Sequence, residues 1–328
     1  MGRHSAFRFV RGAGWRCGLM IALLWAGVAS AQYPNKPIRI VVGFPPGGSA
    51  DAVTRILGEA LSKSLAQPVV VDNRPGADSV IAAEIVMRAA PDGYTLLFAS
   101  SNTLVAPMAM RKAPPYDSQA EFAPISQLGG ATLFLYTHPA LPARTVAEFI
   151  QYLRANPGKL NNGVPNSVAL LSNRQLMSLS GTKMTEIPYK GEGPMLPDMV
   201  AGRLQASFIS VSSALSMAAD GRLRILAVAL DQRSALVPDV PTFAEAGFPG
   251  LTVRHIAGIV GPKKLPRGVI DHVSREINAQ LKRANIKDQF ERQGYTVRGS
   301  TPAEFAAVVR ENIETWKRIV RDTGIPLE

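Results

Sequence analysis

The sequence predicts an α/β protein of two lobes, each a mostly parallel sheet flanked by helices. Apolar segments of strand length alternate with amphipathic segments of helical period, an order typical of parallel sheets with right-handed crossovers. This alternation runs in two series, and the second begins near Ala131. The chain has 328 residues, which is too many for one simple core and enough for two compact lobes.

The first 31 residues have the pattern of a secretion signal. A basic head precedes an apolar run over residues 18–28, and Ala29-Ser30-Ala31 provides an A-x-A cleavage site. The run is too short to span a bilayer comfortably, so we expect an exported, periplasmic protein with no membrane insertion. The segment holds four arginines and no acidic residue, so its removal lowers the formal charge from +11 to +7. It also holds Cys17, the single cysteine, which excludes disulfides and thiolate chemistry from the mature chain.

The first lobe opens with a strand over residues 38–42, a Pro-Gly turn and a helix. Pro45 and Pro46 stiffen the turn, and Ser49 is a plausible helix N-cap. Gly47 and Gly48 leave backbone N–H groups uncovered at the positive end of the helix dipole, an arrangement that suits a carboxylate. The residues alone leave a second interpretation open, which is a tight strand-to-helix turn without a ligand.

Two more strand segments complete the opening series, over residues 68–72 and 94–99, with a helix over 80–90 between them. The carboxyl ends of parallel strands lie at one edge of a sheet, where ligands bind. We therefore expect the loops at residues 44–49, 75–79 and 100–103 to converge.

The second series predicts five strands, and its crossings back to the first lobe define the boundaries. Residues 129–230 are expected to form lobe 2, and residues 32–128 with 231–328 to form lobe 1, with the ligand in the cleft between them. Capping boxes at Thr145–Glu148 and Thr301–Glu304 predict two helix starts. A further strand around residues 252–260 and two amphipathic helices complete the chain. The five strands are expected at 131–136, 160–163, 185–189, 204–209 and 223–230.

Motifs for catalysis, metals and cofactors are missing from the sequence. The mature histidines His138, His255 and His272 lack ligand spacing, and no basic block interleaved with aromatic residues predicts nucleic-acid binding. No Gly-x-Ser-x-Gly elbow or Walker lysine occurs. We expect no enzyme activity, no metal and no cofactor. The competing class is a periplasmic hydrolase with Ser49, Ser100 or Ser167 as nucleophile, which would need a base within reach.

Several segments, in order along the mature chain, resemble the Bug family of periplasmic solute receptors of tripartite tricarboxylate transporters. The resemblance implies a two-lobe type II periplasmic binding protein fold, a small carboxylated ligand, and the membrane subunits of such a transporter as partners. A receptor that reports its ligand to a signalling partner is the alternative. The matching segments are Phe44-Pro45-Pro46-Gly47-Gly48-Ser49-Ala50-Asp51 and residues 33–39, 73–77, 91–96, 122–125, 188–191, 226–228 and 238–247.

The resemblance and the predicted cleft loops together give the expected ligand site. Its residues are Phe44, Pro46, Gly47, Gly48, Ser49, Ala50, Asp78, Ser79, Ser100, Ser101, Asn102, Asn166, Ser167, Gly191, Ile209 and Ser210.

Three departures from the family pattern bear on the ligand. Asp78 stands where relatives usually have glycine, and would either repel a ligand anion or cap the following helix. Residues 162–167 lack the usual Ser/Gly-rich turn and histidine. After Phe208, this chain has Ile209-Ser210 where many relatives have Asp-Asn, and the loss of that aspartate removes an acceptor for a ligand ammonium. These changes predict a less polar second-lobe wall and a carboxylate with an aromatic or mostly apolar body.

Overall fold

The structure is a computed structural model that describes residues 1–2 and 33–327. It divides into two units, Met1–Asn35 and Lys36–Glu328, and the fold described below is that of the second unit. The predicted secretion signal lies outside the described residues.

Sheet A has six strands in the order β11-β4-β10-β3-β1-β2. β1 pairs in parallel with β2 and β3, whereas β10 runs antiparallel between β3 and β4, and β11 runs antiparallel to β4. β10 is antiparallel because the chain enters it on its return from the second sheet. The strands are β1 (Ile38–Val42), β2 (Val69–Asn73), β3 (Thr95–Ser100), β4 (Phe122–Ala131), β10 (Ala257–Pro262) and β11 (Tyr295–Val297).

Sheet B has five strands in the order β7-β6-β8-β5-β9. β6 pairs in parallel with β7 and β8, and β5 runs antiparallel to β8 and β9. The expected α/β architecture with two sheets is confirmed, but both sheets are mixed rather than mostly parallel. The strands are β5 (Leu133–Thr137), β6 (Asn161–Val164), β7 (Thr185–Pro188), β8 (Ala206–Ser210) and β9 (Arg224–Val228).

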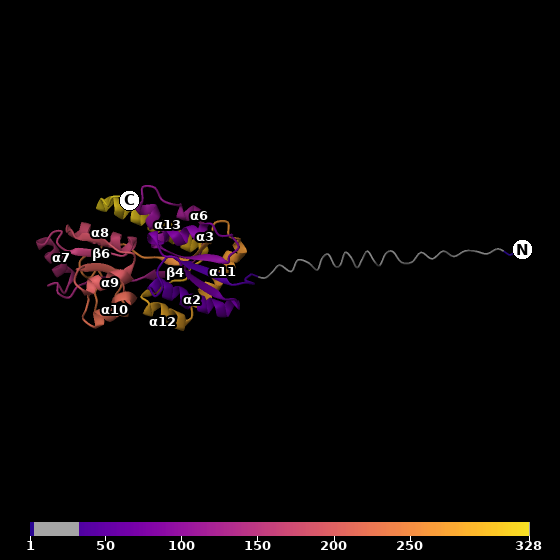
Figure 1. The fold of residues 1–328 in the computed structure, drawn as a ribbon, viewed down its shortest axis with the longest axis horizontal. Helices are drawn as coiled ribbons and strands as arrows, with labels where there is room; N and C mark the ends of the chain where they lie inside the picture. The colour runs from indigo at the N-terminus through magenta and orange to yellow at the C-terminus, as the bar shows by residue number, and fades with distance from the viewer. Residues whose placement is uncertain (3–32, 328) are drawn as a thin grey trace. The chain divides into compact units, whose positions relative to one another are not determined.

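Helices cover both sheets (Figure 1). α2 packs on β2, and α11 and α13 pack on β4, while α8 packs on β6 and β8. The helices are α2 (Ser49–Leu65), the 3₁₀ turn η1 (Ala77–Ser79), α3 (Val80–Met87), α4 (Ser101–Leu104), α5 (Ala106–Met110), α6 (Ser118–Glu121), α7 (Val146–Ala155), α8 (Ser167–Ser180), α9 (Glu192–Val200), α10 (Val211–Ala219), α11 (Arg267–Leu281), α12 (Ala284–Arg292) and α13 (Pro302–Thr323).

Capping side chains account for several of these helix starts. Thr301 and Glu304 form a complete capping box at α13. At α7 the Thr145 side chain accepts from the Glu148 N–H, but the Glu148 carboxylate accepts from the Arg144 N–H and not from that of Thr145. At α2 the N-cap is Gly48, not Ser49 as expected, and no side chain caps it.

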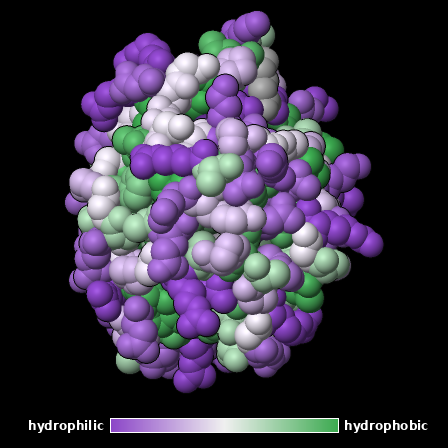
Figure 2. Space-filling model, turned by 90° about the vertical axis from the view of Figure 1, so that its left-hand side faces the viewer, coloured by the Kyte–Doolittle hydropathy of each residue, from purple (hydrophilic) through white to green (hydrophobic). Residues whose placement is uncertain are grey.

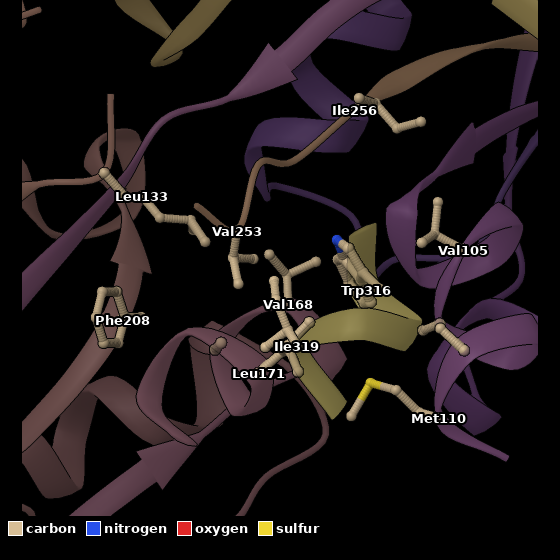
Figure 3. Close-up of a cluster of buried hydrophobic side chains, with 14 of the residues drawn as sticks. Val105, Met110, Leu133, Val168, Leu171, Phe208, Val253, Ile256, Trp316 and Ile319 are labelled. Atoms are coloured by element: carbon tan, nitrogen blue, oxygen red, sulfur yellow. The ribbon is translucent and has the colours of Figure 1, made fainter. Parts of the chain in front are cut away.

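A single apolar cluster joins the two sheets (Figure 3). Val168 and Leu171 of α8 lie against Trp316 and Ile319 of α13, with Phe208 of β8 at the sheet B end. Trp316 and Leu171 are completely buried. The contact between α8 and α13 therefore fixes the second sheet to the long C-terminal helix of the first through close-packed side chains.

The chain crosses between the sheets at two neighbouring places. β4 ends at Ala131 and β5 begins at Leu133, while the return passes through His255 and Ile256 into β10. A Cβ on Gly130 would lie 1.9 Å from the His255 carbonyl oxygen, and one on Gly129 would lie 1.7 Å from that of Thr296. Glycine is therefore required on both positions, because backbones approach each other there more closely than a side chain permits.

The segment after β9 still packs on sheet B beyond residue 230, where the lobe boundary was expected. Phe243 stacks on Phe208 of β8 with ring centroids 5.6 Å apart, and Thr242 forms a parallel bridge with Val228. We therefore propose that the second lobe boundary lies nearer residue 253, and we keep the first near residue 131.

Polar side chains dominate the face shown in Figure 2, where apolar residues form small separate patches. Within the described residues, none of the helices combines the length and apolar character that a bilayer span requires.

The close backbone approach at Gly130 predicts that a side chain there lowers the stability of the protein. Gly130→Ala should lower the free energy of unfolding by at least about 2 kcal/mol, because the new methyl group can only be accommodated by a backbone shift. Gly268→Ala in α11 is the matched control, since a Cβ there meets nothing within 4 Å, and its stability should stay equal or rise by up to about 1 kcal/mol. Urea unfolding measures both, and equal stability of the two variants would contradict the close approach.

Candidate functional site

The first turn of α2 presents backbone donors without acceptors. Gly47 adopts a φ of +84°, and Gly48 is extended before the helix begins at Ser49. In the described chain, no acceptor pairs with the N–H of Gly48, Ser49 or Ala50. These groups lie at the positive end of a helix of 17 residues, where an anion is favoured.

Asp51 holds this turn in place and corrects one expectation. Its buried carboxylate accepts from the Gly47 N–H at 2.9 Å, so the predicted open donor at Gly47 is wrong. The same carboxylate accepts from Asn73 and Arg55. Burial acts to raise the pKa of Asp51, but the hydrogen bonds from Arg55, Gly47 and Asn73 outweigh it and hold that pKa below its ordinary value.

The three loops at the carboxyl ends of β1, β2 and β3 converge as predicted. Asn73 Nδ2 donates to the Phe44 carbonyl at 3.1 Å, and Ser79 Oγ donates to the Gly43 carbonyl at 3.2 Å. Asn102 Nδ2 donates to Asp78 Oδ1 at 2.6 Å. The parallel register of β2, β1 and β3 sets these loops side by side at one edge of sheet A.

Asp78 reaches across to the other sheet. Its Oδ2 accepts from Oγ of Ser167 and, at 3.4 Å, from the Ser167 N–H at the start of α8. Asn166 caps the same helix by accepting from the Ala169 N–H. The side chain therefore does not cap α3, the helix that follows it, since no side-chain cap is present there.

Two features of Asp78 reflect this position. Ala77, Asp78 and Ser79 all have positive φ, a left-handed turn that costs L-residues roughly 1–2 kcal/mol each. Burial raises the pKa of Asp78 above its ordinary value, against the hydrogen bonds from Ser167 and Asn102 and the charge of Arg111. Such strain is compatible with the contact that the turn makes with α8, which packs on the other sheet.

Glu192 supplies a second carboxylate on the sheet B side. Its Oε1 accepts from the Ser210 N–H at 2.8 Å and its Oε2 from Ser210 Oγ at 2.7 Å, at the start of α10. The predicted loss of an acceptor at Ile209 stays a prediction, and Glu192 of α9 places a carboxylate at the neighbouring Ser210. The sequence does place an acidic residue between two glycines after β7, in Gly191-Glu192-Gly193, but it does not show which group this acid contacts.

Tyr295 connects this side to α2. Its hydroxyl lies close to the Ser49 side chain, and burial together with the charge of Glu192 raises the pKa of Tyr295. Burial and the charge of Glu192 likewise raise the pKa of Tyr136 in β5. Neither tyrosine was expected at the site, since both lie in strand segments without a motif.

The other predicted site residues have varied surroundings. Phe44 is half-buried, Pro46 is exposed, and Gly191 is the N-cap of α9 with φ +107°. Ser101 serves the backbone, because its hydroxyl accepts from the Ile256 N–H at 2.8 Å, whereas Ser100 Oγ is buried without a partner in the described residues. Ile209 is completely buried in the apolar cluster that contains Met195 of α9 and Ala214 of α10, so its side chain belongs to the core.

The residues described here include no group of three or more His, Cys, Asp or Glu that could hold a metal ion. His255 lies at the crossing, where its Nδ1 accepts from the Ala131 N–H at 2.9 Å and its ring meets the edge of Tyr295. Among the described residues, Ser167 Oγ donates to Asp78, and the Ser49 side chain lies close to the Tyr295 hydroxyl.

Residues 53–325 match the model of the tripartite tricarboxylate transporter family receptor. The chain belongs to this family. It is a periplasmic solute-binding receptor family, as the resemblance implied.

Similar proteins cover nearly the whole chain. Protein BugT of Bordetella pertussis is 34% identical over 318 residues, covering 95% of this chain and 97% of that protein. The structure of Rpa4515 from R. palustris with adipate has a TM-score of 0.84 at 27% identity, covering 90% of this chain and 99% of that one. MatC from Rhodopseudomonas palustris with bound malate has a TM-score of 0.81 at 28% identity, covering 88% and 100% of the two chains. This receptor therefore shares its two-lobe fold with them.

The stability of the receptor should fall in acid because of His255, which lies where the chain crosses between the sheets. Burial lowers the pKa of His255 to about 4 from an ordinary value of 6.5, so the unfolded chain binds a proton that the folded chain rejects. The stability due to neutral His255 is present above pH 6.5 and is lost as the pH falls towards 4, by up to roughly 3 kcal/mol. Because carboxylates titrate in the same range, the test compares the wild type with His255→Gln by urea unfolding at pH 7.5, 5.5 and 4.5. The wild type should lose more stability than the variant, and parallel profiles would contradict a neutral buried imidazole.

Proposed function

We propose that this receptor captures a small organic carboxylate in the cleft between its lobes and delivers it to the membrane subunits of a tripartite tricarboxylate-type transporter. The ligand is delivered unchanged, without turnover. One observation carries the proposal, which is the set of unpaired N–H groups of Gly48, Ser49 and Ala50 at the start of α2.

These donors suit one carboxylate group. Charge-assisted hydrogen bonds from backbone N–H groups to a carboxylate are about twice as strong as neutral ones, and the helix dipole adds a favourable field. The adipate and malate of the two Rhodopseudomonas structures are both carboxylates, which supports the same chemistry for this chain.

Each sheet contributes one group to the surroundings of this turn, so the ligand can favour the closed arrangement. Tyr295 of β11 lies close to Ser49, and the charge of Glu192, from α9 on the sheet B side, acts on the same tyrosine. A ligand that contacts both sides only when the lobes are together shifts the population towards the closed state by its difference in affinity. That closed state is the form in which we expect delivery to the transporter.

The absence of turnover is inferred from the surroundings of the three candidate nucleophiles. Ser167 is hydrogen-bonded to Asp78 and Ser49 lies close to Tyr295, while Ser100 Oγ is buried without a partner in the described residues. None of the three is paired with a histidine there. His255 is neutral and accepts from a backbone N–H, so its Nδ1 lone pair is already used at the crossing.

The site is tested by Gly48→Asp. The backbone at Gly48 is extended with φ −80°, and the nearest atom to a new Cβ would be the Pro45 carbonyl oxygen at 3.7 Å, so the chain accepts a side chain there. Aspartate at an N-cap accepts from the N–H groups of the first turn and brings a like charge. Ligand affinity should fall by at least 100-fold, measured by calorimetry with the acid that stabilises the wild type best in a thermal-shift screen.

Gly48→Ala is the matched control, because it adds the same Cβ without an acceptor or a charge. Its affinity should stay within about tenfold of the wild type, and both variants should melt within a few degrees of it. An unchanged dissociation constant for Gly48→Asp would show that the carboxylate is bound elsewhere.

A further inference from the structure

We propose that the receptor selects monocarboxylates with an uncharged or cationic far end, because Asp78 and Glu192 place the chain's own carboxylates at the starts of α8 and α10 on the sheet B side. This inference rests on the proposed function, since it assumes that the ligand carboxylate binds at α2. The predicted ligand class differs from adipate and malate, which are the dicarboxylates in the two similar structures.

The first observation is the occupied start of α8. This helix has 14 residues, and its first N–H, that of Ser167, donates to Asp78 Oδ2 together with the Ser167 hydroxyl. Asn166 takes the N–H of Ala169. The N–H groups of Ser167 and Ala169 at this start are therefore paired within the chain, whereas that of Val168 has no acceptor among the described residues.

The second observation is independent and comes from α9 and α10. Glu192 accepts from both the N–H and the hydroxyl of Ser210, so a carboxylate of the chain also lies at the N-cap of α10. The charge of Glu192 contributes to the raised pKa of Tyr295, whose hydroxyl lies close to Ser49 at the α2 turn. A negative group thus lies within electrostatic reach of the proposed binding turn.

The two sides of the cleft therefore differ in charge. On the sheet A side, the N–H groups of Gly48, Ser49 and Ala50 lack acceptors and attract an anion. At the helix starts on the sheet B side, Asp78 and Glu192 already accept from Ser167 and Ser210, so a second ligand carboxylate would meet like charges and fewer open donors. A methyl end meets neither penalty, and an ammonium end gains attraction from the same two groups.

The wild type is tested with three acids of one chain length. Hexanoate, adipate and 6-aminohexanoate share one carboxylate and differ only at the far end, and butyrate, succinate and 4-aminobutyrate repeat the comparison for a shorter ligand. Calorimetry should show at least one monocarboxylate of a set binding tenfold or more tighter than its diacid. A diacid that binds as tightly as both matched monocarboxylates would overturn the inference while leaving the proposed function intact.

Variants separate occupancy from charge. Asp78→Gly suits the positive φ of 52° and frees the start of α8, so the ratio of diacid to monoacid affinity should rise at least tenfold. Asp78→Asn removes the charge but keeps a side chain on the helix start, so its gain should be smaller. Glu192→Gln should reduce the preference for the amino acid over its matched monoacid by at least threefold.

Glu148→Gln is the control, because Glu148 is also a carboxylate at a helix start, that of α7, where it accepts from the Arg144 N–H. Its acid preferences should equal those of the wild type. If Asp78→Gly leaves the diacid ratio unchanged although it folds, as judged by its melting temperature, the role of Asp78 in selection is wrong. If no acid of either set binds the wild type, the carboxylate site at α2 fails and this inference fails with it.

Discussion

Unpaired backbone donors at the first turn of α2 are the constraint on which the account depends. An N–H group removed from water without an acceptor costs about 1–3 kcal/mol, so closing the cleft over Gly48, Ser49 and Ala50 requires an acceptor from outside the chain. Asp51 fixes the shape of the turn by pairing with Gly47 and Asn73, but leaves those three groups open. In the proposed function, these backbone groups supply the driving force for ligand capture.

The packing between the lobes determines how this driving force is used. α8 lies against α13 through Val168, Leu171, Trp316 and Ile319, so this side of the cleft is held by an apolar contact. The crossings at Gly129 and Gly130 allow close backbone approach and leave no room for a side chain. Movement of the lobes is therefore expected to be concentrated near these crossings.

The sequence predicted the parts of this structure that depend on local patterns. The strand–turn–helix at residues 38–65, the convergence of three loops and the capping box at Thr301 follow from period, glycine placement and capping chemistry. The antiparallel β10 and the short β11 were not predictable, because their pairing partners are remote in sequence. The same limit applies to the site. The hydrogen bonds that Ser167 donates to Asp78 and Ser210 donates to Glu192 depend on contacts between elements, which a single sequence does not show.

The central claim is most directly tested by the amide resonances of the α2 turn. In a protein labelled with ¹⁵N, addition of hexanoate or of the tightest-binding acid should move the signals of Gly48, Ser49 and Ala50 downfield, because each N–H gains a charged acceptor. The Gly47 signal should move less, since Asp51 already accepts from that group. Saturating ligand that leaves the three signals in place while shifting those of Ser167 or Ser210 would contradict the account.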